Sequence, residues 1–150
     1  MNVGKVCNHE VILTGINSSL ADVAGLMRRY HVGTVIVVEE ENGRTMPVGI
    51  VTDRDLVVKV LAEGVDADTV ALADLMSRNP LIVTESDDIN TALNAMRDRG
   101  VRRVPVVDAE GDLSGVLSID DLLWELSRSL DNIVSLLVRQ PRVEARRQAN

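Results

Sequence analysis

Two short segments of the chain place a hydroxyl and a carboxylate three residues apart at the start of a predicted helix. They are residues 52–55 (TDRD) and 118–121 (SIDD), and each follows an apolar strand that begins with glycine. A hydroxyl and an acid at this spacing are typical of a capping box, which satisfies free backbone N–H groups. The same helix start can hold a phosphate beside the hydroxyl, while the acid accepts hydrogen bonds from ribose hydroxyls. Helix capping and nucleotide binding are therefore both open on the local pattern.

The two segments belong to a repeat that covers most of the chain. Residues 20–56 align with residues 89–122, with Met27 on Met96 and Val35 on Val104 at one offset. A small unit that recurs in this way rarely buries its apolar face alone, so we expect the copies to pack on each other. Polar residues at matching positions then meet near a pseudo-twofold axis, where clefts form. The repetition favours a functional role for both segments.

Hydrophobic spacing and turn residues predict the same order of elements in each copy: strand, helix, strand, strand, helix. Strands are expected at residues 11–13, 35–38, 48–51, 81–83, 104–107 and 113–117, and helices from residue 20 and over 53–61, 89–99 and 120–130. Caps are expected at Ser18 or Ser19 and at Asp87 or Asp88. The order predicts an α+β fold of two βαββα repeats packed about a pseudo-twofold axis.

The expected domain boundaries follow from this pattern. They are a first repeat over residues 8–63, a connecting segment over 64–78 with a short helix near 72–76, a second repeat over 79–130, and a C-terminal extension over 131–150. The extension begins with an apolar helical stretch that includes Ile133, Val134 and Leu137. We expect this face to pack on the module or on a second subunit, because apolar surface is costly to expose. Gln140-Pro141 is expected to end the helix and leave a loose basic tail.

Composition excludes several classes of function. The 150 residues carry 23 acids against 16 bases, a net charge of −7, which argues against binding to nucleic acid phosphates. No apolar run approaches the roughly 18 residues that cross a bilayer. The single Cys7 excludes an internal disulfide and suits a reducing compartment, so a soluble, cytoplasmic protein is expected. His9 and His31 have no companions at metal-ligand spacing, so no metal is expected.

Three stretches carry a resemblance to a known family: residues 49–56 (GIVTDRDL), 101–108 (VRRVPVVD) and 115–122 (GVLSIDDL). Over about residues 8–130 the chain resembles the cystathionine-β-synthase (CBS) domain family, and two such domains in tandem resemble a Bateman module. The resemblance implies two clefts between the repeats that often bind adenine nucleotides or related adenosyl ligands. It also implies a homodimer, in which the apolar helix faces near residues 122–137, Trp124 included, contribute to the interface.

Each implied cleft combines the strand-to-helix turn of one repeat with strands of the other. We refer to them as the Thr52 cleft and the Ser118 cleft. By resemblance, the Thr52 cleft uses Thr52, Asp55, Pro80, Leu81, Ile82, Arg103 and Val104. By resemblance, the Ser118 cleft uses Ser118, Asp121, Val11, Ile12, Thr34 and Val35. The aspartates would hold ribose, the hydroxyls phosphate, and the strand residues adenine.

The two clefts are not expected to be equal. Thr34 and Gly33 occupy the positions that match Arg103 and Arg102 in the second repeat. Because the arginine fork suits phosphate, we expect the Thr52 cleft to bind a nucleotide more tightly. Arg103 could instead pair with a surface acid, so this alternative stays open.

The sequence thus predicts a non-catalytic regulatory module that senses an adenine nucleotide or adenosyl ligand of the AMP, ADP, ATP or NAD class. No cofactor is expected, and an unidentified protein would receive the signal. Three alternatives remain: a structural or dimerisation protein with empty clefts, an enzyme, and DNA binding by the basic tail. The enzyme lacks a recognisable catalytic constellation in the sequence.

Overall fold

The computed structural model describes the backbone of residues 1–148 and the side chains of residues 1–138. The first repeat contains β1 (Leu13–Gly15), α1 (Leu20–Tyr30), β2 (Thr34–Glu41), β3 (Arg44–Thr52) and α2 (Asp53–Leu56), which continues as the π-helical turn η2 (Val57–Leu61). Strand β1 is parallel to β2, and β2 is antiparallel to β3. The hairpin between β2 and β3 turns at Asn42-Gly43, where both residues have positive φ, as the primed hairpin turns require.

The connecting segment contains η3 (Ala67–Thr69), α3 (Leu72–Leu75) and β4 (Ser77–Arg78), and β4 joins the first sheet beside β3. The second repeat then follows with β5 (Val83–Thr84), α4 (Ile89–Arg99), β6 (Arg103–Val107), β7 (Leu113–Ser118) and α5 (Ile119–Gln148). Its sheet has the order β5-β6-β7, with the same parallel and antiparallel pairing as in the first repeat. The predicted α+β fold with two βαββα repeats is confirmed.

The caps that begin the long helices of each repeat are among those predicted. The hydroxyl of Ser19 accepts the N–H of Asp22 at 3.1 Å, and the carboxylate of Asp88 accepts the N–H of Asn90 at 2.9 Å. Helix α4 occupies the predicted residues 89–99. Strands β1 and β5 start two residues later than predicted, although the carbonyl oxygen of Ile12 already accepts the N–H of Ile36 on β2 at 3.0 Å.

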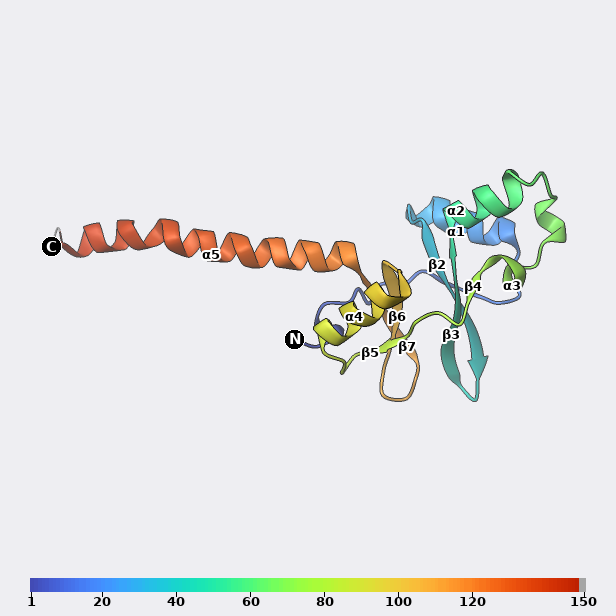
Figure 1. Cartoon of the computed structure of the whole chain (residues 1–150), viewed down its shortest axis with the longest axis horizontal. Coiled ribbons are helices and arrows are strands. Elements are labelled where there is room, and N and C mark those ends of the chain that lie inside the picture. The colour runs from blue at the N-terminus through green and yellow to red at the C-terminus, as the bar shows by residue number, and fades with distance from the viewer. Residues whose placement is uncertain (149–150) are drawn as a thin grey trace.

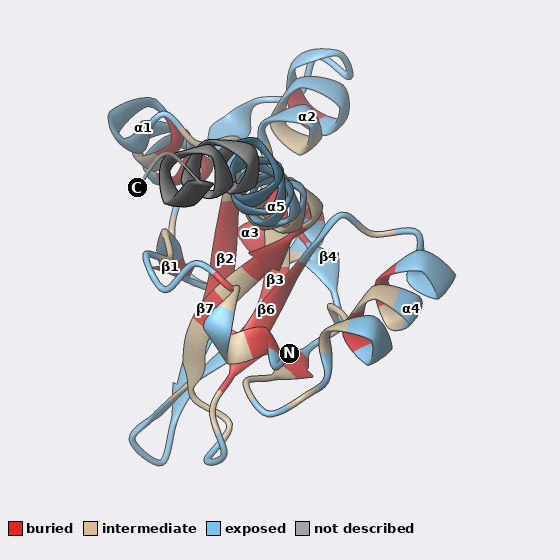
Figure 2. Cartoon of the chain, turned by 90° about the vertical axis from the view of Figure 1, so that its left-hand side faces the viewer, coloured by how far each residue is buried: buried red, intermediate tan, exposed pale blue. Residues whose placement is uncertain are grey.

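Each repeat has its own hydrophobic core, and Figure 2 shows the buried residues concentrated on the central strands of both sheets. The first core includes Leu20, Val23 and Leu72, and the second includes Met96, Val104 and Leu117. Val3 and Cys7, which precede the first repeat, are buried in the core of the second. The N-terminal segment therefore completes the repeat that is farther along the chain.

Helix α5 leaves the body of the molecule as a single long rod (Figure 1). The expectation that Gln140-Pro141 ends this helix is wrong, because the backbone is helical to Gln148. Proline removes only one backbone donor, and good helix formers surround it in the sequence. The side chains of the basic tail lie outside the described residues. Among the described residues, no helix is both long and apolar enough to cross a membrane.

The N-terminal segment lies directly against β7. Asn8 and Val116 exchange two backbone hydrogen bonds of 2.9 Å, and this close approach occurs beside Gly115. A Cβ atom at Gly115 would lie 2.9 Å from the Cys7 Sγ and 3.0 Å from the Asn8 carbonyl oxygen. Glycine at this position is therefore a condition for the segment to reach the strand.

The side chain of His9 adds two contacts that attach the same segment to β7 and to its own start. Its Nδ1 lies 2.9 Å from the carbonyl oxygen of Ser114, and its Nε2 lies 3.1 Å from that of Gly4. Because both partners only accept, the protonated ring alone donates to both of them. The two carbonyls, that of Ser114 foremost, raise the pKa of His9 above its ordinary value of 6.5, and Glu85 adds to the increase.

The first prediction concerns the packing of the segment on β7. Gly115→Ala should destabilise the protein by about 1–3 kcal/mol, because a backbone carbonyl opposes the added methyl group. Urea titration of the free energy of unfolding measures the effect. Gly15→Ala is the control, since a Cβ atom there meets no atom within 4 Å. Equal stability of the two variants would contradict the prediction.

The second prediction concerns pH. Because folding raises the pKa of His9, protonation stabilises the folded chain; this contribution is complete below about pH 6.5 and is lost as pH rises through the folded pKa. His9→Gln should therefore reduce the loss of stability on raising the pH through this range, as measured by urea titrations at several pH values. His31→Asn, at a residue with a φ of +54°, removes the other histidine and should retain the wild-type dependence. An unchanged pH profile in His9→Gln would show that the hydrogen bonds of His9 to Ser114 and Gly4 do not contribute to the pH dependence of stability.

Candidate functional site

The first strand-to-helix turn forms a complete capping box. The Thr52 hydroxyl accepts the N–H of Asp55 at 3.2 Å, and the Asp55 carboxylate accepts the N–H of Thr52 at 2.9 Å. The other carboxylate oxygen of Asp55 pairs with the Lys59 ammonium at 3.0 Å. Both oxygens of Asp55 are thus engaged within their own repeat.

The second turn shares half of this capping pattern and has a different charge balance. The Ser118 hydroxyl donates to Asp121 at 2.6 Å and accepts the N–H of Asp121 at 3.1 Å. The position that matches Lys59 is Glu125, which pairs with Arg128 at 3.2 Å. Asp121 therefore has no cation at the place where Asp55 has one.

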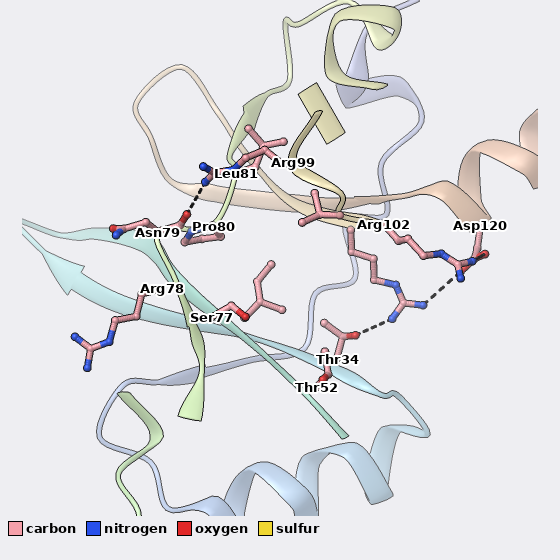
Figure 3. Close-up of a pocket in the computed structure, with 13 residues that line it drawn as sticks. Thr34, Thr52, Ser77, Arg78, Asn79, Pro80, Leu81, Arg99, Arg102 and Asp120 are labelled. Carbon is pink, nitrogen blue, oxygen red and sulfur yellow. Dashed lines mark hydrogen bonds and ion pairs between the residues drawn. The ribbon is translucent and has the colours of Figure 1, made fainter. Parts of the chain in front are cut away.

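A cavity of about 520 Å³ lies between the repeats at the first turn and corresponds to the Thr52 cleft. Figure 3 shows its walls, which come from β2, β3, β4, the end of α4 and the start of β6. Its apolar lining consists of Ile50, Pro80, Leu81 and Val101. Its charged lining consists of Arg78, Arg99, Arg102 and Arg103 together with Asp120. The cleft therefore pairs an apolar surface with an excess of positive charge.

A smaller cavity of about 290 Å³ lies at the second turn and corresponds to the Ser118 cleft. One wall is the N-terminal segment, which contributes Asn8, Glu10, Val11 and Ile12. Ser118, Asp120 and Asp121 form the facing wall. The Gly115 and His9 contacts described above thus position one side of this cleft.

The two clefts share a wall made of Thr34, Arg103 and Asp120. The guanidinium of Arg103 donates to the Thr34 hydroxyl at 2.8 Å and lies 3.5 Å from the Asp120 carboxylate, which also pairs with Arg102 at 3.2 Å (Figure 3). Arg103 therefore does pair with a surface acid, and it does so at the mouth of both clefts. The side chain is less than half exposed, so it could turn toward a ligand without leaving the wall.

The structure brings together most of the residues expected at each site. The Thr52 cleft is lined by the expected Thr52, Pro80, Leu81 and Arg103, and the Ser118 cleft by the expected Ser118, Asp121, Val11, Ile12 and Thr34. Asp55 and Ile82 are outside the lining. Val35 and Val104 are also outside it, because both point into the cores. Assignment of all these residues to a ligand stays a prediction.

Sequence reasoning missed several residues that line the Thr52 cleft. Arg78 and Asn79 come from the connecting segment, and Arg99 from the last turn of α4. Arg99 donates to the carbonyl oxygen of Asn79 at 3.0 Å, which links the connecting segment to the second repeat. The three arginines around Gly100, at positions 99, 102 and 103, are the sequence feature that could have indicated a positively charged cleft wall.

Other reactive groups do not form a second site in the described part of the chain. Residues 1–138 contain no group of three or more His, Cys, Asp and Glu side chains that could hold a metal ion. The Cys7 Sγ lies 3.7 Å from the His9 Nε2, and burial raises the pKa of the thiol. The thiol form is thus favoured, which suits a buried structural cysteine.

Comparison with known proteins gives consistent matches. An uncharacterized protein of Methanopyrus kandleri is 37% identical over 123 residues, which are 82% of this chain and 61% of that protein. Hypoxic response protein 1 of Mycobacterium tuberculosis is 31% identical over 126 residues, which are 84% of this chain and 81% of that protein. A CBS domain protein from Pyrobaculum aerophilum, solved in complex with AMP, aligns with a TM-score of 0.74 and 26% identity, covering 87% of this chain and 97% of that one.

The CBS domain family model matches twice, at residues 3–62 and 72–128. The two matches contain the two strand-to-helix turns and all the strands of both sheets. By sequence, fold and repetition, this chain belongs to the CBS domain family and carries a tandem pair of CBS domains.

Proposed function

We propose that the chain is a regulatory module that binds an adenine nucleotide between its two CBS domains and catalyses no reaction. The observation that carries the proposal is the Thr52 cleft, with an apolar wall and three arginines (Arg99, Arg102 and Arg103) against one aspartate, since the fourth, Arg78, pairs with Asp74 outside the lining. An apolar slot suits a nucleobase, and arginine forks suit phosphate oxygens. The related Pyrobaculum protein was solved with AMP, which supports the same ligand class for this chain.

The residues suggest how the ligand lies. The base would pack between Ile50, Pro80 and Leu81, and the phosphate would lie toward Arg102 and Arg103. Arg103 would exchange its bond to Thr34 for a bond to phosphate, so binding would alter the contact that joins the repeats. A ligand that prefers one packing of the repeats shifts the population toward it, and this is how a partner protein would receive the signal. A cytoplasmic location fits the lone cysteine.

A second candidate, a structural protein with empty clefts, is favoured by one specific observation. Both carboxylate oxygens of Asp55 already accept from the capping box or pair with Lys59, so ribose hydroxyls would have to share them with these partners. Thermal melting with AMP, ADP, ATP, NAD and S-adenosylmethionine separates the candidates, because a ligand that binds only the folded chain raises its stability. Stabilisation by none of the five would favour the structural protein.

The third prediction tests the proposed site. Arg103→Gln should weaken AMP binding by roughly 10- to 100-fold, the effect of losing a charge-assisted hydrogen bond, as measured by isothermal titration. Arg97→Gln, on the exposed side of α4 and outside both clefts, is the matched control and should bind as the wild type does. Melting of the ligand-free variants reports any effect on the repeat contact itself. Unchanged AMP affinity in Arg103→Gln would remove Arg103 from the site.

We also propose that the chain forms a homodimer through α5. Leu123, Leu126, Leu130, Ile133 and Leu137 follow the alternating three- and four-residue spacing of a coiled-coil seam. Each of these side chains is more than half exposed, and that of Trp124 is 70% exposed. The first half of the helix is acidic in sequence and the second half basic, so an antiparallel pair with a second copy would bring opposite charges together.

The fourth prediction concerns this helix. Replacing both Leu130 and Ile133 with aspartate should convert a dimer into a monomer, because buried unpaired carboxylates are strongly unfavourable in an apolar seam. Light scattering coupled to size exclusion measures the mass. Asn132→Asp, an exposed polar position between them, should leave the dimer intact. A wild-type mass of one chain would refute the proposed dimer.

A further inference from the structure

The two clefts carry opposite charge, although they are related by an internal repeat. In the Thr52 cleft, Arg99, Arg102 and Arg103 outnumber the single Asp120, whereas Arg78 pairs with Asp74 outside the cleft lining. In the Ser118 cleft, Glu10, Asp120 and Asp121 outnumber Arg103, with His31 as the other titratable group. An anionic group would therefore be attracted to one cleft and repelled by the other.

The shared wall does not cancel this difference. Asp120 is paired with both Arg102 and Arg103, so its charge is largely balanced in either cleft. The positive charge of Arg103 is likewise balanced by Asp120, and its guanidinium also donates to the Thr34 hydroxyl. The charge that remains toward the Ser118 cleft comes from Asp121 and Glu10.

The repeat itself explains why Asp121 lacks the neighbouring cation that Asp55 has. In the first repeat, Lys59 lies one helical turn beyond Asp55 and pairs with it at 3.0 Å. In the second repeat the matching residue is the acid Glu125. The cation that balances the acid of one turn is thus replaced by a second acid at the other.

The clefts also differ in size, at about 520 Å³ and about 290 Å³, but S-adenosylmethionine is as large as a nucleoside diphosphate, so the charge and not the volume separates the two ligand classes. Exclusion by repulsion is an efficient source of selectivity, since like charges at close range cost more than a lost contact.

We infer that the Ser118 cleft takes an adenosyl ligand whose 5′ substituent is uncharged or cationic, a thioether or sulfonium nucleoside, while phosphorylated nucleotides bind in the Thr52 cleft. This inference rests on the proposed function, because it assumes that the clefts bind adenosyl ligands. It adds that the chain reads two chemically different ligands rather than two copies of one. The carboxylates of Asp121 and Glu10 discriminate between them.

The test uses isothermal titration of the full chain with ATP, S-adenosylmethionine and 5′-methylthioadenosine. S-adenosylmethionine should still bind to ATP-saturated protein, with one site for each ligand, because the two ligands occupy different clefts; the shared Arg103 can change its affinity without making the two ligands compete. Asp121→Asn should weaken the affinity for S-adenosylmethionine by about tenfold and leave the affinity for ATP unchanged. Arg102 lines only the Thr52 cleft, so Arg102→Gln should weaken the affinity for ATP and leave the affinity for S-adenosylmethionine unchanged.

Glu10→Gln provides a second variant that does not depend on the helix cap, because Glu10 lies on the exposed N-terminal segment. This variant should weaken the binding of S-adenosylmethionine. It should not change the binding of 5′-methylthioadenosine, because that ligand has no positive charge for Glu10 to attract. Competition between ATP and S-adenosylmethionine for one site, or unchanged affinity for S-adenosylmethionine in both acid variants, would overturn the inference and leave nucleotide binding standing. Binding of none of the three probes would overturn the proposed function as well.

Discussion

The bond between Arg103 and Thr34 is the contact on which the arrangement of both clefts depends. It joins β6 of the second repeat to β2 of the first, and the same guanidinium reaches Asp120 at the start of α5. This side chain lines both cavities and joins the repeats there, while the Thr45 N–H, which donates to Asp112 at 2.6 Å, joins them at the hairpin between β2 and β3. Any ligand that engages this arginine acts on the contact between the repeats, with no need for a distant relay.

The strand-to-helix turns show how one local structure serves two purposes. At both Thr52 and Ser118 the hydroxyl accepts the N–H of the aspartate three residues on, because a helix start leaves the same free N–H groups in each repeat. What differs is one turn further on, where Lys59 is replaced by Glu125. The cap therefore secures the fold in both repeats, and the charge beyond it is free to vary.

Much of the fold could be predicted from the sequence, since the repeat, the apolar runs and the caps are local signals. Helix α4 and the cap at Ser19 are examples, because each depends on residues within a few positions. The continuation of α5 past Pro141 was not predicted. The prediction gave the single proline more weight than the helix formers around it, whereas the helix continues to Gln148. Val35 and Val104 were expected in the clefts, but which face of a strand is buried depends on the helix packed against it. The lining by Arg78 and Arg99 depends on β4 joining the first sheet, a pairing of two residues that no sequence pattern marks.

The N-terminal segment has a consequence for how the protein folds. Val3 and Cys7 come before the first domain, yet they share a core with Val83 of β5 and Leu117 of β7. Contacts that span so much of the chain are slow to form, because the intervening chain must first be ordered. The second domain therefore completes its core only with a segment from the far side of the first domain, so we expect the two domains to unfold together.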